Sequence, residues 1–141
     1  MYRLVDTNIL LDSPKILKEE DLIISIKVLK ELDGLKRHTN PEIAEKARRA
    51  AIIISKQLNE MKFDMTEENI PTDDLLLKVA KRKGYQLITN DVNLKVRAAA
   101  EGIESEGYSN KNDYTGVQYL AAEEEETIAK ILLQEPTEIR E

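Results

Sequence analysis

The sequence predicts an α/β fold of three layers, α/β/α, with a mostly parallel central sheet of four to five strands. Three observations lead to this prediction. Short apolar runs of strand length alternate with longer segments whose apolar residues repeat at helical spacing. Each link between successive strands is long enough to hold a helix, as a parallel crossover requires. The 141 residues suffice for one domain with its own core, which needs no disulfide.

The N-terminal third contains two pairs of strand and helix. Residues 2–5 form the first predicted strand, and the polar residues 6–8 supply capping side chains for the helix that follows. Residues 22–25 are a second apolar run of buried-strand length, after which apolar side chains recur at helical spacing over residues 28–35. The chain therefore alternates strand and helix from its first residues.

The middle of the chain is predicted to be helical. An Asn-Pro pair at residues 40–41 predicts the start of a long helix that continues to Met61. After a polar stretch, Thr72 can cap the next helix, which we expect to end before Gly84. These two segments supply the longest helical patterns of the sequence.

The alternation continues beyond the second of these helices. Residues 86–89 form a third predicted strand, followed by capping side chains at residues 90–91 and a helical pattern that ends at Gly102. A fourth strand is expected to start at Ile103. Strands separated in this way by helices indicate parallel crossovers.

The composition excludes several classes of function. Cysteine is absent, which rules out thiol nucleophiles and cysteine-bound zinc. The net charge of -6 argues against binding a polyanion by general attraction, so any contact with nucleic acid must be local. No apolar run approaches the ~18 residues of a membrane span, and the first residues lack a signal-peptide pattern. We therefore expect a cytoplasmic protein with no membrane partner.

Acidic residues follow the predicted strands, at the edge where ligand sites form in parallel sheets. Asp6 directly follows the first strand, and Asp91 follows the third by two residues. Glu31 lies early in the helix after the second strand, and the adjacent Asp73 and Asp74 lie at the start of another helix. Four carboxylates could therefore converge. Because like charges repel, a divalent cation would be needed to stabilise them.

Such a cluster suits Mg²⁺ or Mn²⁺, which prefer oxygen ligands, activate water and bind phosphate oxygens. This chemistry points to hydrolysis of phosphodiester bonds without a side-chain nucleophile. Other interpretations stay open, because Asp6 and Asp91 occupy positions where aspartate commonly caps a helix. A helical glutamate such as Glu31 is commonly a solvated surface residue.

Asp73 and Asp74 compete for one place in this cluster. Leu76 and Ala80 follow Asp73 by three and seven residues, which puts these side chains on one face of the helix. We therefore favour Asp73 as the inward carboxylate, with Asp74 turned partly away and in a supporting position.

Four segments together resemble a known family. They are LVDTNILLDSP, IKVLKELDGLKR, TDDLLLKVAKRKGYQLITNDVNLK and GIESEGY. In order and spacing they resemble PIN domains, and among these the PIN domains at the front of PhoH-like proteins. The resemblance implies a PIN-like fold and a metal-dependent nuclease that acts on single-stranded RNA.

The resemblance also implies roles for individual residues. Asp6, Asp73 and Asp91 match metal-binding acids, and Glu31 matches the helical glutamate of the family. We therefore expect these four residues to form the catalytic set. The supporting positions are Thr7, Asn8, Asp74, Thr89 and Asn93.

The domain organisation is expected to follow the same match. Residues 1–120 are predicted to form the PIN-like nuclease domain, and residues 121–141 an amphipathic helix with a frayed tail. PhoH-like proteins carry an ATPase domain after the PIN domain, but the phosphate-loop motif of such a domain is absent from this sequence. The chain could be a freestanding relative, or its last residues could be a connector to an ATPase domain.

We predict a metal-dependent endoribonuclease that hydrolyses single-stranded RNA. Two alternatives stay open: a toxin-type PIN nuclease controlled by an antitoxin, and a non-catalytic RNA-binding module that works with an ATPase or helicase. A homodimer is a further expectation, because the apolar residues 52–54 could supply an interface, although they could equally be core. Basic residues gather at 27–37, 46–49 and 78–83, and one of these groups could hold the RNA backbone.

Overall fold

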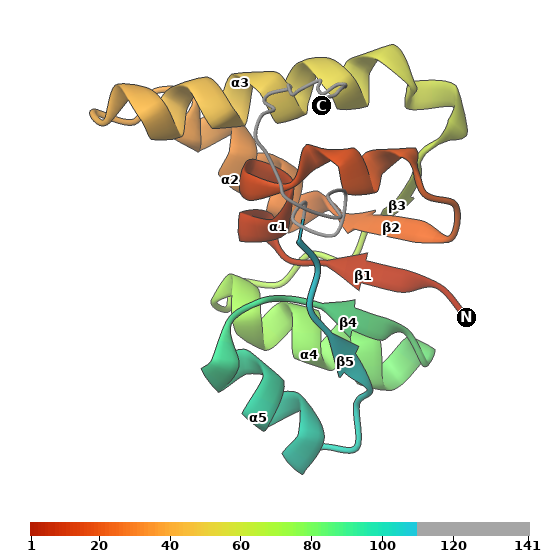
Figure 1. Ribbon diagram of the computed structural model, residues 1–141. Coiled ribbons are helices and arrows are strands. Elements are labelled where there is room, and N and C mark those ends of the chain that lie inside the picture. The colour runs from red at the N-terminus through yellow and green to blue at the C-terminus, as the bar shows by residue number, and fades with distance from the viewer. Residues whose placement is uncertain (110–141) are drawn as a thin grey trace, which may run out of the picture. The chain divides into compact units, whose positions relative to one another are not determined.

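The computed structural model describes residues 1–109. Residues 1–108 form one compact unit built around a five-stranded sheet (Figure 1). The domain boundary expected at residue 120 and the amphipathic helix expected over residues 121–141 lie outside the described residues.

The sheet is parallel in all of its strand pairs. Its strands are β1 (Arg3–Val5), β2 (Leu22–Ser25), β3 (Lys62–Asp64), β4 (Gln86–Ile88) and β5 (Ser105–Glu106). They are arranged in the order β3-β2-β1-β4-β5, so the first strand of the chain lies at the centre. Helices flank this sheet in a three-layer α/β/α arrangement, which confirms the predicted fold class.

The crossovers between the strands contain the helices. Those of the described residues are α1 (Thr7–Asp12), α2 (Ile26–Leu35), α3 (Pro41–Lys56), α4 (Thr72–Lys83) and α5 (Val92–Ala100), with short 3-10 segments at Pro14–Lys18 and Leu58–Glu60. Helices α1, α2 and α3 pack on one another near β1 and β2, whereas α4 and α5 lie along β4 and β5 (Figure 1). Within residues 1–109, no helix is both long and apolar enough to cross a membrane.

Local sequence signals set the bounds of these helices. The hydroxyl of Ser25 accepts a hydrogen bond from the amide of Lys27 at the start of α2. The side chain of Asn40 accepts one from the amide of Glu42 at the start of α3. Gly84 ends α4 in the left-handed conformation, with a φ of 73° that costs glycine little.

The middle of the chain differs from the prediction. The helix predicted to continue to Met61 ends at Lys56, and a 3-10 turn follows it. Strand β3 then forms at Lys62–Asp64, where the sequence pattern predicts no strand. This is an edge strand of three residues in which only Asp64 is fully buried, so it lacks the apolar run that marks a buried strand.

The core lies between the sheet and the helices. Its largest fully buried side chains include Leu4, Ile24, Leu75, Leu76, Leu87 and Ile88. The apolar stretch of α3 is divided: Ile54 is buried, Ile53 is half-buried against the core, and Ile52 is 54% exposed. Most of that stretch therefore serves as core, as one of the two sequence interpretations expects.

The register of the two central strands positions the carboxyl edge of the sheet. Val5 lies opposite Ile88, where β1 and β4 end. The amide of Asp6 then donates a hydrogen bond of 2.9 Å to the carbonyl of Ile88, which extends the pairing by one step. Asp6 and Thr89, which are 83 positions apart in the chain, therefore leave the sheet side by side.

Candidate functional site

Asp6 and Thr89 form a buried polar pair at the carboxyl ends of β1 and β4. The hydroxyl of Thr89 donates a hydrogen bond to the Asp6 carboxylate at 2.8 Å. Thr89 is fully buried, and Asp6 is only 6% exposed. Asp6 stands at the capping position of α1, but its side chain makes no capping hydrogen bond. The structure therefore does not support the interpretation of Asp6 as a helix cap.

The pKa of Asp6 is raised above its ordinary value. Burial is the largest cause, because it penalises the charged form of the carboxyl group. Hydrogen bonds from the Thr89 hydroxyl and the Thr7 amide oppose this effect, whereas repulsion from the carboxylates of Asp73 and Asp91 adds to it. Three acidic side chains therefore influence one another at this edge of the sheet.

Asp91 does cap a helix, as one interpretation of the sequence expects. Its Oδ1 accepts a hydrogen bond of 3.2 Å from the amide of Leu94 at the start of α5. Its own amide donates to the hydroxyl of Thr89 at 3.0 Å. Thr89 thereby connects the backbone of Asp91 to the carboxylate of Asp6. Because capping engages one oxygen of an exposed carboxylate, the Asp91 side chain keeps acceptor capacity for a further partner.

Glu31 is held by hydroxyl groups from two other helices. Thr7 Oγ1 donates to Oε1 of Glu31 at 2.6 Å, and Thr72 Oγ1 donates to Oε2 at 2.7 Å. Thr7 directly follows Asp6, and Thr72 directly precedes Asp73, so Glu31 ties together the starts of α1 and α4. The prediction that Thr72 caps α4 is wrong: it is the first residue of the helix, and its hydroxyl turns to Glu31 instead.

The two adjacent aspartates at the start of α4 have different surroundings. Asp73 is half-buried, and its pKa is raised by burial first and by repulsion from Asp91 second; Arg97 opposes this rise, and Glu31 adds to it. Asp74 forms an ion pair with Arg97 at 2.5 Å. Asp73 therefore faces the other acids, and Asp74 faces a cation.

The remaining supporting residues do not join this network. Asn8 and Asn93 are exposed in the first turns of α1 and α5, and neither side chain is hydrogen-bonded to an acid of the cluster. Among residues 1–109, no three Asp, Glu or His side chains lie close enough together to enclose a metal ion. The structure therefore brings Asp6, Glu31, Asp73 and Asp91 to one edge without closing them into a ligand set.

Sequence reasoning missed two contacts of this site. The link from Thr72 to Glu31 spans 41 positions, and the only local sign of it is that Thr72 stands directly before an aspartate pair. Arg97 lies outside the three basic groups of the sequence, and it pairs with Asp74 across 23 positions. No local pattern indicates this second contact, because it depends on how α5 packs beside α4.

The donor set has the chemistry of a site for a hard divalent cation. All four acids offer carboxylate oxygens, the ligands that Mg²⁺ and Mn²⁺ prefer. Burial is the largest cause of the raised pKa values of Asp6 and Asp73, and repulsion from the neighbouring carboxylates adds to it, so negative charge is crowded at this edge. A nearby cation would favour the ionised forms of both groups. The residues present therefore fit such a cation in donor type and charge.

Comparison with known proteins places this fold. A family profile described as PIN domain matches residues 4–109. A domain of a functionally unknown protein from Methanocaldococcus jannaschii is similar over 85% of this chain and 98% of its own length, with 19% identity and a TM-score of 0.57. The PIN domain of human SMG5 is similar over 76% of this chain and 93% of its own length, with 15% identity and a TM-score of 0.50. No curated protein matches.

At these identities the likeness to the solved structures concerns the fold alone, a three-layer α/β/α domain. The family profile places the chain in a class of nuclease folds that generally work with divalent metal ions. Because the profile match covers most of the sequence, the chain belongs to the PIN domain family.

Proposed function

We propose that this protein is a metal-dependent endoribonuclease that hydrolyses single-stranded RNA. The observation that carries the proposal is the buried carboxylate of Asp6 at the end of the central strand, where Asp73 and Asp91 are near enough to repel it. A buried acid whose pKa is raised by burial and by like charges is typical of functional sites. Membership of the PIN domain family supports a nuclease, and the four sequence segments support RNA as the substrate.

In this proposal Asp6, Asp73 and Asp91 hold Mg²⁺ or Mn²⁺. When bound, a cation of this kind activates water and neutralises negative charge on the scissile phosphate. Thr89 fixes the rotamer of Asp6 through its 2.8 Å hydrogen bond, and the capping bond at the start of α5 fixes Asp91. Two of the three aspartates would thus present their oxygens from positions that the fold already holds.

Glu31 completes the site as a positioning residue that also contributes negative charge. Both of its carboxylate oxygens accept hydrogen bonds from threonine hydroxyls, one beside Asp6 and the other beside Asp73. Its charge acts on Asp73, where it adds to the rise in pKa. We therefore propose that Glu31 sets the distance between the start of α1, which follows Asp6, and the start of α4, which contains Asp73.

The order of the four sequence segments supports kinship with the PIN domains of PhoH-like proteins. On that basis we propose a cytoplasmic protein that works with an ATPase domain or an ATPase partner on RNA. A purification from native cells tests this part of the proposal, because an ATPase should be retained with the full chain or encoded in the same polypeptide.

Two measurements on the full chain test the enzyme: calorimetric titration with Mn²⁺, and cleavage of a labelled single-stranded RNA with and without Mn²⁺. The variants are Asp6→Asn and, as a matched control, Asp33→Asn. Asp33 is an exposed acid of α2 that is paired with Lys36 at 2.9 Å and with Arg37 at 3.5 Å, and it is not among the charges that act on Asp6 or Asp73.

The wild type and Asp33→Asn are expected to bind Mn²⁺ and cut the RNA, whereas Asp6→Asn keeps its circular dichroism spectrum but loses both properties. Undiminished cleavage by a clean preparation of Asp6→Asn would overturn the proposal. RNA binding by a wild-type chain that neither binds Mn²⁺ nor cuts would favour the non-catalytic RNA-binding module instead.

A further inference from the structure

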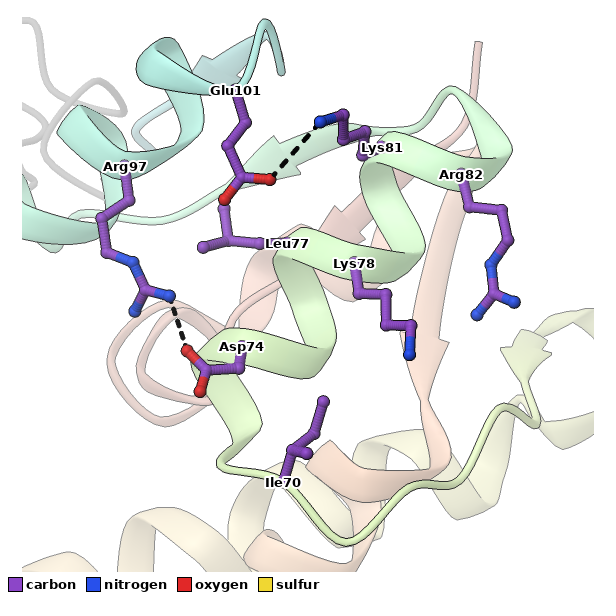
Figure 2. A pocket seen from close by; sticks show the side chains of 8 residues that line it. All are labelled: Ile70, Asp74, Leu77, Lys78, Lys81, Arg82, Arg97 and Glu101. Atoms are coloured by element: carbon purple, nitrogen blue, oxygen red, sulfur yellow. Dashed lines mark hydrogen bonds and ion pairs between the residues drawn. The ribbon is translucent and has the colours of Figure 1, made fainter.

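A groove beside α4 and α5 carries an excess of positive charge. Four cations line it, together with two acids, and its volume is about 570 Å³ (Figure 2). The cations are Lys78, Lys81, Arg82 and Arg97, and the acids are Asp74 and Glu101. Such a local excess stands out in a chain whose net charge is -6. It is the kind of surface that a polyanion requires in an otherwise acidic protein.

The groove begins at the edge of the acidic cluster. Asp74, which lines it, directly follows Asp73, and Arg97 both pairs with Asp74 and acts electrostatically on Asp73. From Asp74 the lining continues along α4 to Arg82, about 12 Å farther at the rise of a helix. Figure 2 shows the cations of α4 on one side of Leu77 and Arg97 on the other. A chain lying in this groove would therefore reach the cluster at one end.

The cations of the groove are available to an incoming polyanion. Lys78 and Arg82 share the carboxylate of Glu68, at 2.6 and 3.8 Å, and Lys81 lies 3.9 Å from Glu101. The side chains of these three cations are 49%, 54% and 61% exposed. Exposed pairs of this kind contribute little to stability, so phosphate groups can replace the carboxylates at low cost.

A second hollow beside the cluster has the opposite charge. Its titratable lining consists of Lys27 and Lys30 against Glu31, Glu67 and Glu68, so that acids outnumber bases. Lys27 is also occupied there, because its ammonium group donates to the carbonyls of the loop before α4. This hollow therefore offers a polyanion less positive charge than the groove along α4 does.

The groove offers charge and apolar surface but no aromatic platform. None of the residues that line it is aromatic, and its apolar part comes from Ile70 and Leu77. Single-stranded nucleic acids are commonly gripped by base stacking on aromatic side chains together with contacts to the backbone. Only the second kind of contact is provided here. Binding in the groove should therefore depend weakly on base sequence.

We infer that this groove binds the sugar-phosphate backbone of single-stranded RNA next to the cleavage site, with Lys78 and Arg82 as phosphate contacts. The inference rests on the proposed function for the choice of RNA. It goes beyond that function because it names the surface along which the RNA lies and because it predicts that binding there does not depend on the base sequence.

A matched pair of double variants tests the inference. In Lys78→Gln/Arg82→Gln two exposed cations that share Glu68 are neutralised. In the control Arg48→Gln/Arg49→Gln two similarly exposed cations of α3 that share Glu45 are neutralised. Binding of a labelled oligouridylate to each full chain is measured by fluorescence anisotropy over a series of salt concentrations. EDTA is present, so that cleavage plays no part.

The groove variant is expected to bind at least about fivefold more weakly than the wild type at low salt, while the control variant binds within twofold. Its plot of log affinity against log salt should be less steep by about 1.4, because each lost phosphate contact removes about 0.7 from the slope. Equal losses in the two double variants, or none in the groove variant, would overturn the inference. A wild-type chain that does not bind the RNA would overturn it as well.

The proposed function is judged separately, by cleavage in Mn²⁺. Cleavage that depends on Asp6 but not on the groove residues would support the proposed enzyme and refute the role of the groove. RNA binding that depends on the groove, without cleavage in any divalent metal, would support the role of the groove and refute the proposed enzyme. The circular dichroism spectrum and unfolding midpoint of each variant show whether a loss of binding reflects a loss of fold.

Discussion

Thr72 and Glu31, 41 positions apart in the chain, are joined by a hydrogen bond of 2.7 Å. The other oxygen of the same carboxylate accepts from Thr7 at 2.6 Å. A single side chain of α2 thus holds the first residues of α1 and α4, beside Asp6 and Asp73. The distance between Asp6 and Asp73 therefore depends on the hydroxyl groups of Thr7 and Thr72.

Replacing Thr72 by valine should weaken Mn²⁺ binding. Valine keeps the shape of threonine but cannot donate to Glu31, so the start of α4 is less firmly held. Loss of a partner that orients a metal ligand typically costs 10- to 100-fold in affinity, and we expect about tenfold here. Thr72→Ser keeps the hydroxyl and should bind almost as the wild type does in the same titration. If the two variants lose affinity equally, the hydroxyl has no positioning role.

Replacing Asp6 by asparagine should raise the stability of the metal-free protein at neutral pH. The pKa of Asp6 is higher in the folded state than in the unfolded state. Protonation of Asp6 therefore stabilises the folded state fully at pH values below the unfolded pKa, and this stabilisation is lost as the pH rises through the folded pKa. Asparagine removes the buried charge and still accepts from Thr89. Each 1 kcal/mol gained would raise the unfolding midpoint by roughly 4 °C in a domain of this size.

The same variant should not be stabilised by metal, whereas the wild type should be. Saturating Mn²⁺ should raise the unfolding midpoint of the wild type, because a ligand that binds only the folded state stabilises it. The midpoint of Asp6→Asn should not move. A metal-free midpoint below that of the wild type, measured in EDTA by calorimetry, would show that burial of the charge is not costly.

The adjacent aspartates of α4 should differ when each is replaced by asparagine. Asp73 faces the other acids and is a proposed ligand, so Asp73→Asn should reduce Mn²⁺ affinity at least tenfold. Asp74 is paired with Arg97, so Asp74→Asn should leave the affinity within about twofold. Titration of both variants in one buffer makes the comparison direct. The reverse ranking would assign the ligand to Asp74.

Asp64 should make folding sensitive to acid. Burial by itself raises the pKa of this carboxyl, but hydrogen bonds from Lys83 and from Thr66 outweigh it and hold the pKa below its ordinary value. The stabilisation is therefore present above the unfolded pKa near 3.9 and is lost as the pH falls through the folded value. Asp64→Asn should lower the free energy of unfolding by about 1–2 kcal/mol at neutral pH.

This loss should shrink as the pH falls towards 3, because protonated Asp64 no longer accepts from Lys83 as a carboxylate. Urea unfolding of the wild type and the variant at several pH values measures the difference. Asp33→Asn serves as a control at an exposed ion pair and should change stability much less. A constant difference across this range would place the effect of Asp64 in packing instead of charge.

The sequence alone was enough to predict the fold class and the position of Asp6. Buried parallel strands are short apolar runs, and residues that follow them meet at one edge by geometry. Strand β3 could not be predicted in this way, because an edge strand needs neither a long apolar run nor two buried faces. Its residues Lys62, Phe63 and Asp64 are exposed, half-buried and buried in turn.

The contacts of the site were less accessible to sequence reasoning than its residues. Thr72 is a good capping residue by type, and nothing near it in the chain indicates that a glutamate of α2 competes for its hydroxyl. Helical periodicity favours Asp73 over Asp74 as the inward acid, but the pairing of Asp74 with Arg97 depends on the packing of two helices. Tertiary structure decides such contacts, and periodicity reports only the face of a helix.

The central position of β1 has a consequence for synthesis of the protein. This strand is translated before the other strands of the sheet, yet the partner that completes its pairing arrives 83 positions later, and Asp91 later still. A nascent chain emerging from the ribosome therefore cannot assemble the acidic edge until most of the domain has been made. Under the proposed function, an incomplete product would be unable to cut RNA, including the message from which it is being translated.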